Sequence, residues 1–122
     1  MAALIVPIND YSPVYQGDTG NAFIIQVLHL NGYLSILGAT ITMVMQSVSD
    51  PTIFHTCDPT KWTIDSLDNG RASYAYQTAD VAIADSWKMW IKIVLSSGRV
   101  VHVDDGKGSP IILVVLPLPS GV

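Results

Sequence analysis

Cysteine is almost absent from the chain, since Cys57 is the single one among 122 residues. One cysteine cannot form a disulfide within the chain, and we expect no metal site built on cysteine. Small secreted domains are usually cross-linked, so this shortage predicts an origin in a reducing cytoplasm. The opening residues lack the basic and apolar regions of a signal peptide. No apolar run approaches the roughly 18 residues that a membrane span requires. We therefore expect a soluble protein that no standard signal exports.

Charged side chains are also scarce, at 13% of the residues. Six Lys and Arg stand against ten Asp and Glu, for a formal net charge of −4, which leaves no basic face for nucleic acid. Apolar residues make up 49% of the chain, so a disordered chain is excluded. So few charges on so apolar a chain suggest that other subunits cover part of its surface.

Helical patterns are nearly missing, and only residues 78–84 could form a helical turn, with Thr78 as its N-cap. Turn signals rich in Gly, Asp and Asn recur at short intervals. Between them, apolar and polar residues alternate, as expected for strands with one buried face. Strands are predicted at residues 22–30, 40–46, 62–64, 72–76, 87–95, 99–103 and 111–116. The first of these is apolar at nearly every position, which predicts a central strand covered on both faces.

This pattern predicts an all-β fold, in which about 7–8 short antiparallel strands form a β-sandwich rather than a closed barrel. The length suits one domain spanning residues 1–122. Residues 1–12 are predicted to form an extended N-terminal arm, and residues 117–122 a proline-containing C-terminal tail. The tail is expected to be free to dock elsewhere, and both segments are candidates for contacts with neighbouring subunits.

Asp18-Thr19-Gly20 matches the catalytic triplet of aspartic proteases, in which a dimer brings two carboxylates together. A dimeric, retroviral-type aspartic protease is therefore one alternative. Against it, Gln16-Gly17 stand where an apolar pair should seat the triplet in a strand. A turn leading into the next strand explains these residues better, because a motif of three residues is weakly specific.

The three histidines His29, His55 and His102 lie in separate segments without a metal-ligand spacing. His29 is expected near the end of a hairpin. We therefore expect no catalytic residue, no cofactor site and no metal site, and the chain is predicted not to be an enzyme.

Trp90 lies on the polar side of its predicted strand, where an exposed tryptophan often marks a protein interface. Extended termini can add a strand to a neighbour's sheet edge. The residues expected to contact partner subunits are Leu4, Ile5, Val6, Trp90, Leu116 and Leu118. A second alternative is a carbohydrate-binding β-sandwich that uses Trp90 as a sugar platform.

The order of several motifs resembles the N-terminal domain of upper baseplate proteins of tailed bacteriophages. The resemblance begins at residues 13–20 and continues through Asp68-Asn69-Gly70, residues 79–81 and 87–92, and the stretch 104–116. It covers nearly the whole chain. It implies an immunoglobulin-like β-sandwich, without catalytic residues at the matched positions.

The resemblance also implies a structural protein of the phage virion, located in the baseplate, in the tail or on the capsid surface as a decoration protein. Its partners would be other phage structural proteins, such as the major capsid protein, and further copies of itself in a homo-oligomer. Nucleic acid and membrane are not expected as partners. The expected location is the virion, assembled in the host cytoplasm.

Overall fold

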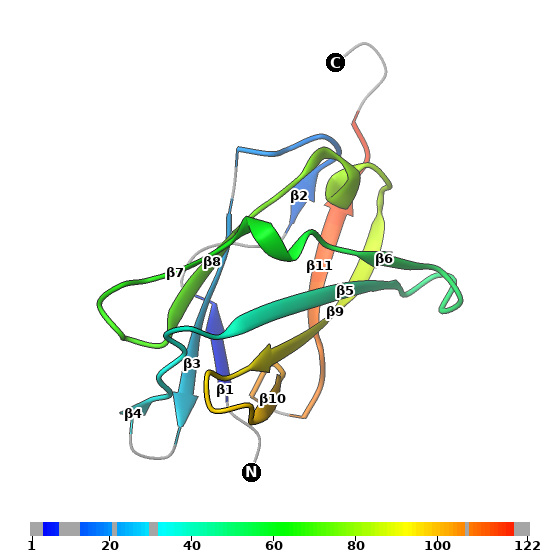
Figure 1. Cartoon of the computed structure of the whole chain (residues 1–122). Coiled ribbons are helices and arrows are strands. Elements are labelled where there is room, and N and C mark those ends of the chain that lie inside the picture. The colour runs from blue at the N-terminus through cyan, green and yellow to red at the C-terminus, as the bar shows by residue number, and fades with distance from the viewer. Residues whose placement is uncertain (1–3, 8–12, 21, 30–31, 107, 119–122) are drawn as a thin grey trace.

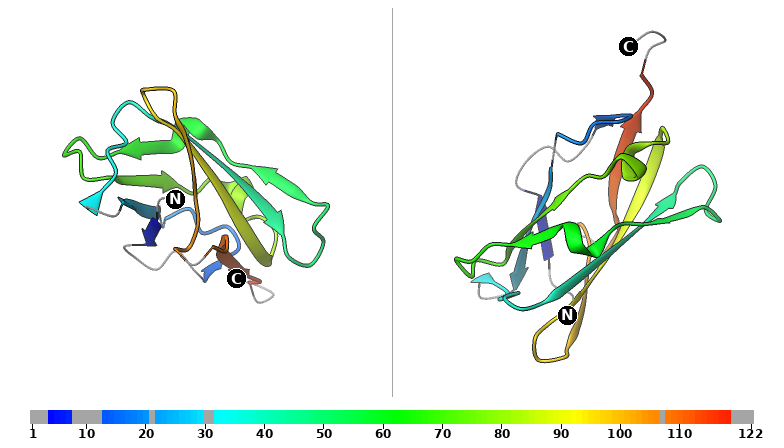
Figure 2. Two further views of the ribbon diagram at one scale, coloured as in Figure 1. Left: turned by 90° about the horizontal axis from the view of Figure 1, so that it is seen from below. Right: turned by 45° about the horizontal axis from the view of Figure 1, so that its top comes forward.

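The structure is a computed structural model, which describes residues 4–7, 13–20, 22–29, 32–106 and 108–118. Its strands form two sheets that pack face to face as the layers of a sandwich (Figures 1 and 2). The predicted all-β sandwich of immunoglobulin-like character is thereby confirmed. No helix within the described ranges is long and apolar enough to cross a membrane.

The first sheet has five strands and is antiparallel throughout its described pairs. Its order is β1 (Leu4–Pro7), β3 (Ala22–His29), β8 (Arg71–Ala75) and β7 (Trp62–Ile64). The short β4 (Gly32–Tyr33) pairs with the end of β3, which confirms the hairpin expected beside His29. The strand β1 therefore lies at an edge of this sheet, with β3 as its neighbour.

The second sheet has six strands. Its order is β2 (Val14–Tyr15), β11 (Ile111–Leu116), β9 (Asp85–Val94), β5 (Thr40–Ser47) and β6 (Phe54–Thr56), and β10 (Val100–Val103) pairs with β9. Two 3-10 helices, η1 (Pro59–Lys61) and η2 (Thr78–Val81), connect strands of the two sheets. The pair β2–β11 is parallel, in contrast to the fully antiparallel prediction.

Alternation along β5 and β9 sends every second side chain into the space between the sheets. Fully enclosed side chains come from both layers, including Phe23, Tyr74, Met43, Met89 and Leu113. Burial of apolar area is the main stabilising contribution to such a core. One continuous hydrophobic cluster joins the two sheets.

Two local predictions need correction. The strand β3 is not covered on both faces: Phe23, Ile25 and Val27 are buried, whereas Ile24 between them is half-buried. The N-cap of η2 is Gln77 rather than Thr78, because the Gln77 backbone N–H donates to the Asp80 carboxylate at 2.8 Å. The structure also contains β1, β2, β4 and β6, which are too short to show a periodicity.

Candidate metal centre

His55 and Cys57 are brought together by the edge strand β6. They are two residues apart, so their side chains point to the same face of an extended chain. His55 is the register partner of Met45, a fully buried residue of β5, so this face is the inner one. The Cys57 N–H donates to the Met43 carbonyl at 2.9 Å and extends the pairing beyond β6. Both side chains therefore point from the sheet edge toward the interior.

Asp80 reaches the same place from η2. The helix follows β8, and the 2.6 Å contact between His55 Nε2 and Asp80 Oδ1 places it beside β6. Asp80 closes the first turn of η2 through its bond with the Gln77 N–H, which turns its carboxylate toward β6 and β8. The Asp80 side chain is 2% exposed. A buried carboxylate needs several donors, and the neighbouring strands supply them.

Three donors satisfy the Asp80 carboxylate. His55 Nε2 lies 2.6 Å from its Oδ1, and the Tyr74 hydroxyl donates to its Oδ2 at 2.6 Å. The third donor is the Gln77 N–H. One ligand atom from each of His55, Cys57 and Asp80 lies within 4.8 Å of the other two. The centre thus contains a nitrogen, a sulfur and an oxygen ligand on three separate segments.

Burial and charge determine the protonation of this centre. Burial raises the pKa of the Cys57 thiol far above its usual range, and the nearby Asp80 carboxylate raises it further. Burial also raises the pKa of the Tyr74 hydroxyl, which donates its proton to Asp80. Cys57 is 2% exposed, whereas the His55 side chain is 29% exposed. Access from solvent to the cluster is therefore on the His55 side.

This geometry favours metal coordination over nucleophilic catalysis. A reactive cysteine needs a lowered pKa and solvent access, and Cys57 has neither. Imidazole, thiolate and carboxylate are together the ligand types of Zn²⁺ and related transition metals. A metal ion would displace the thiol proton, and its positive charge would stabilise the buried thiolate.

The sequence patterns did not predict this cluster. His29 lies on β3 and His102 on β10, and the cluster found among the described side chains does not include His102. The spacing of His55 and Cys57 was a usable signal, because i and i+2 share a face of a strand. Asp80 lies 25 residues from His55 in sequence, and no local pattern links them.

Asp18 closes a tight turn that follows β2, and Thr19 and Gly20 come directly after this turn. The Asp18 N–H donates to the Tyr15 carbonyl at 3.1 Å, and the Asp18 carboxylate accepts from the Tyr15 N–H at 3.2 Å. Such bonds are typical of an aspartate in a turn, and they confirm the turn that the sequence favoured over a protease triplet.

The residues predicted to contact partner subunits lie at several places. Leu4, Ile5 and Val6 belong to β1 and pair with β3 of the same chain. Leu116 ends β11 opposite Tyr15, and the N–H of the exposed Leu118 donates to Gln16 Oε1 at 3.2 Å. Whether they contact other subunits stays a prediction.

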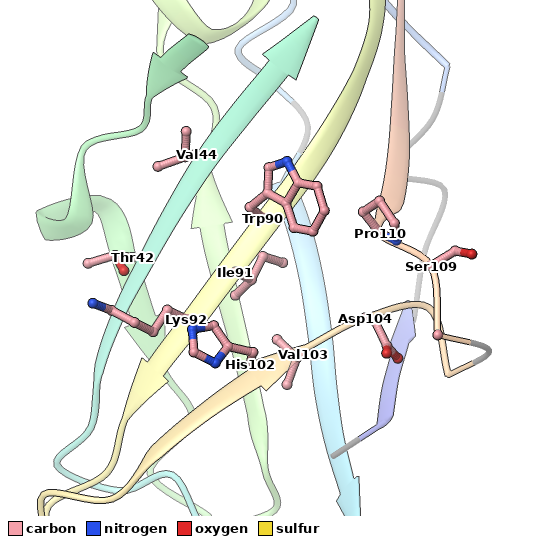
Figure 3. A pocket seen from close by; sticks show the side chains of 11 residues that line it. Thr42, Val44, Trp90, Ile91, Lys92, His102, Val103, Asp104, Ser109 and Pro110 are labelled. Atoms are coloured by element: carbon pink, nitrogen blue, oxygen red, sulfur yellow. The ribbon is translucent and has the colours of Figure 1, made fainter. Parts of the chain in front are cut away.

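Trp90 lies on the outer face of the six-stranded sheet and is 48% exposed, as predicted for the polar side of its strand. It stands in a pocket between β5, β10 and the loop before β11 (Figure 3). This pocket is on the opposite face of the sheet from the buried side chains of β9.

Comparison with known proteins gives a likeness in fold and none in sequence. No family model and no curated protein sequence matches the chain. The fold is similar to the crystal structure of CopC from Methylosinus trichosporium OB3b, with a TM-score of 0.50 and 9% sequence identity. The similarity covers 98% of this chain and 99% of that one. At this identity the likeness concerns the fold.

This comparison corrects the prediction of a tailed-phage virion protein. That role was inferred from a likeness to a phage sandwich domain, whereas a solved structure that shares the fold over nearly its whole length is CopC, not a phage structural protein. The baseplate, tail and capsid-decoration roles are therefore wrong. The aspartic protease and the carbohydrate-binding sandwich find no support either. The resemblance to baseplate domains, the expected partners and the expected location stay predictions.

Proposed function

We propose that this chain is a metal-binding domain that takes up one transition-metal ion of the Zn²⁺ class. The ligands are His55 Nε2, Cys57 Sγ and an Asp80 carboxylate oxygen, and water completes the coordination. The observation that carries the proposal is the convergence of these three ligand atoms within 4.8 Å, from β6, the residue after it and η2.

Small movements would make the cluster fit an ion. Zn²⁺ binds such ligands at roughly 2.0–2.3 Å, which places tetrahedral ligand atoms about 3.3–3.8 Å apart. His55 Nε2 and Asp80 Oδ1, at 2.6 Å, must therefore separate by about 1 Å. The exposed side of His55 gives its ring room to move. Tyr74 would keep its bond to the other Asp80 oxygen and orient the carboxylate.

The metal-free protein keeps its fold in this proposal. His55, Tyr74 and Gln77 satisfy the Asp80 carboxylate without an ion, and the hydrophobic core lies between two complete sheets. This differs from zinc fingers, which are unfolded without metal. We infer reversible uptake, as suits a carrier or sensor of the ion rather than a structural zinc domain.

The test is a titration of the full chain with Zn²⁺, followed by Co²⁺ as a spectroscopic probe. We expect one equivalent to bind and thiolate-to-cobalt absorption to appear in the near ultraviolet. His55→Ala and Cys57→Ser should each weaken Zn²⁺ binding roughly 100-fold or more, because even loss of an outer partner of a ligand costs about 10–100-fold.

His102→Ala is the matched control, since His102 is an exposed histidine of β10 outside the cluster. It should bind Zn²⁺ like the unaltered chain. Circular dichroism of each metal-free variant establishes that it is folded. Cobalt binding without thiolate absorption, or equal losses in His55→Ala and His102→Ala, would contradict the proposal.

A further inference from the structure

The pocket beside Trp90 arises from the way in which three strands meet at β9. On one side, β9 pairs with β5 along its length. On the other side, β11 pairs with residues 85–89 of β9 and β10 with residues 91–94. Trp90 lies at the junction between these two pairings. Asp104 and the residues Gly108, Ser109 and Pro110 before β11 form one wall of the pocket, whose volume is about 490 Å³ (Figure 3). This volume is typical of sites for small molecules.

The indole ring of Trp90 is held in place although half of it is exposed. Its Nε1–H donates to Gln46 Oε1 at 2.9 Å, and the Gln46 amide in turn donates to the Pro51 carbonyl at 3.0 Å. Val44 lies opposite Trp90 on β5, and Pro110 lines the other side of the pocket. The result is a fixed apolar platform, which suits the face of a planar ring.

Side chains that can donate hydrogen bonds to an anion lie at one end of this platform. Lys92 follows Trp90 by two residues on the same face of β9, and its register partners are His102 on β10 and Thr42 on β5. Lys92 takes part in no ion pair among the described residues. Asp104, also in the lining, accepts the Gly106 N–H at 2.7 Å within its own turn. The end of the pocket at Lys92 therefore suits an anion.

We propose that this pocket binds a small planar aromatic carboxylate, with its ring on Trp90 and its carboxylate at Lys92 and His102. The Cα atoms of residues i and i+2 of a strand are about 6.6 Å apart, so a ligand that reaches both side chains needs a short linker between its ring and its carboxylate. An arylalkanoate meets this requirement, and the site is independent of the metal centre on the inner face.

The test uses indole-3-acetate and its neutral analogue indole-3-acetamide, titrated into the full chain labelled with nitrogen-15. The Trp90 indole N–H signal, assigned with Trp90→Leu, reports binding directly. We expect the acid to bind about tenfold more tightly than the amide, because a charged partner strengthens a hydrogen bond by that order. Backbone amide signals of the pocket residues report binding in every variant, and Trp90→Leu should weaken binding of both compounds about fivefold through loss of ring stacking.

Lys92→Met should abolish the preference for the acid over the amide. Lys88→Met is the matched control: Lys88 stands two residues from Trp90 in the other direction, outside the pocket lining, and the charge change is the same. It should keep the preference. Equal loss in both variants, equal binding of acid and amide, or binding of glucose as tight as that of the acid would overturn the proposal.

Discussion

At the scale of single residues, Gly70 shows how a turn depends on the absence of a side chain. Its φ is +72°, a conformation that other residues rarely adopt. A Cβ added there would lie 2.7 Å from the Val27 carbonyl oxygen and 2.9 Å from that of Leu34. Both contacts are backbone atoms of neighbouring segments, so neither can move without disturbing the five-stranded sheet.

Gly70→Ala should therefore lower the free energy of unfolding by about 3 kcal/mol, from backbone strain and the two close contacts together. Gly98→Ala is the control, because Gly98 has φ +88° with open space around it. Gly98→Ala should lower the free energy of unfolding by about 1 kcal/mol, through the backbone conformation alone. Urea unfolding of both variants measures the difference, and equal losses would show that the contacts at Gly70 contribute nothing.

At the scale of elements, each of the two 3-10 helices depends on an aspartate in a different environment. Asp58 caps η1 from an exposed position, and its Oδ1 accepts the Thr60 N–H at 2.9 Å. Asp80 lies within η2, is buried and joins it to β6 and β8. The first aspartate orders one turn, whereas the second fastens a turn to both sheets.

Asp80→Ala should cost about 3 kcal/mol of unfolding free energy, because it leaves the buried Tyr74 hydroxyl and the Gln77 N–H without their acceptor. Asp58→Ala should cost about 1 kcal/mol, as expected for loss of an N-cap. Chemical denaturation in metal-free buffer provides the comparison. If Asp58→Ala proves the more harmful change, the role given to the buried carboxylate is wrong.

Elements with strong periodicity were predictable from the sequence, and those defined by their neighbours were not. The alternation in residues 40–46 and 87–95 predicted β5 and β9, and the predicted bounds of β7 and β11 match the structure. The short strands β2 and β6 exist because β11 and β5 offer them a pairing edge. The metal centre forms because β6 places His55 and Cys57 on one face and because η2 brings Asp80 to them. The spacing of His55 and Cys57 is visible in the sequence, whereas the contact between η2 and β6 is not.

At the scale of the whole molecule, the carboxylates at its turns link stability to pH. Hydrogen bonds from neighbouring residues hold the pKa values of Asp50, Asp58, Asp65 and Asp85 below the usual 3.8. For Asp85 the main cause is the bond from the Ser47 hydroxyl, on the neighbouring strand β5. A carboxyl whose pKa is lower in the folded state stabilises the fold above its unfolded pKa. That stabilisation is lost as the pH falls through the folded value.

The melting temperature should therefore decrease as the pH falls below about 4, which is the ordinary pKa of an aspartate. The melting temperature of Asp85→Asn should decrease less over the same pH range. The amide oxygen still accepts hydrogen bonds from Ser47 and Ser49, and the amide gains no proton at low pH. Calorimetry at pH 6 and at pH 2.5 measures both proteins. Repeating it in about 1 M salt screens general charge repulsion. The smaller decrease in the melting temperature of Asp85→Asn should persist at high salt, because it comes from a short-range hydrogen bond. If the two proteins lose equal amounts at high salt, the acid sensitivity is due to net charge instead.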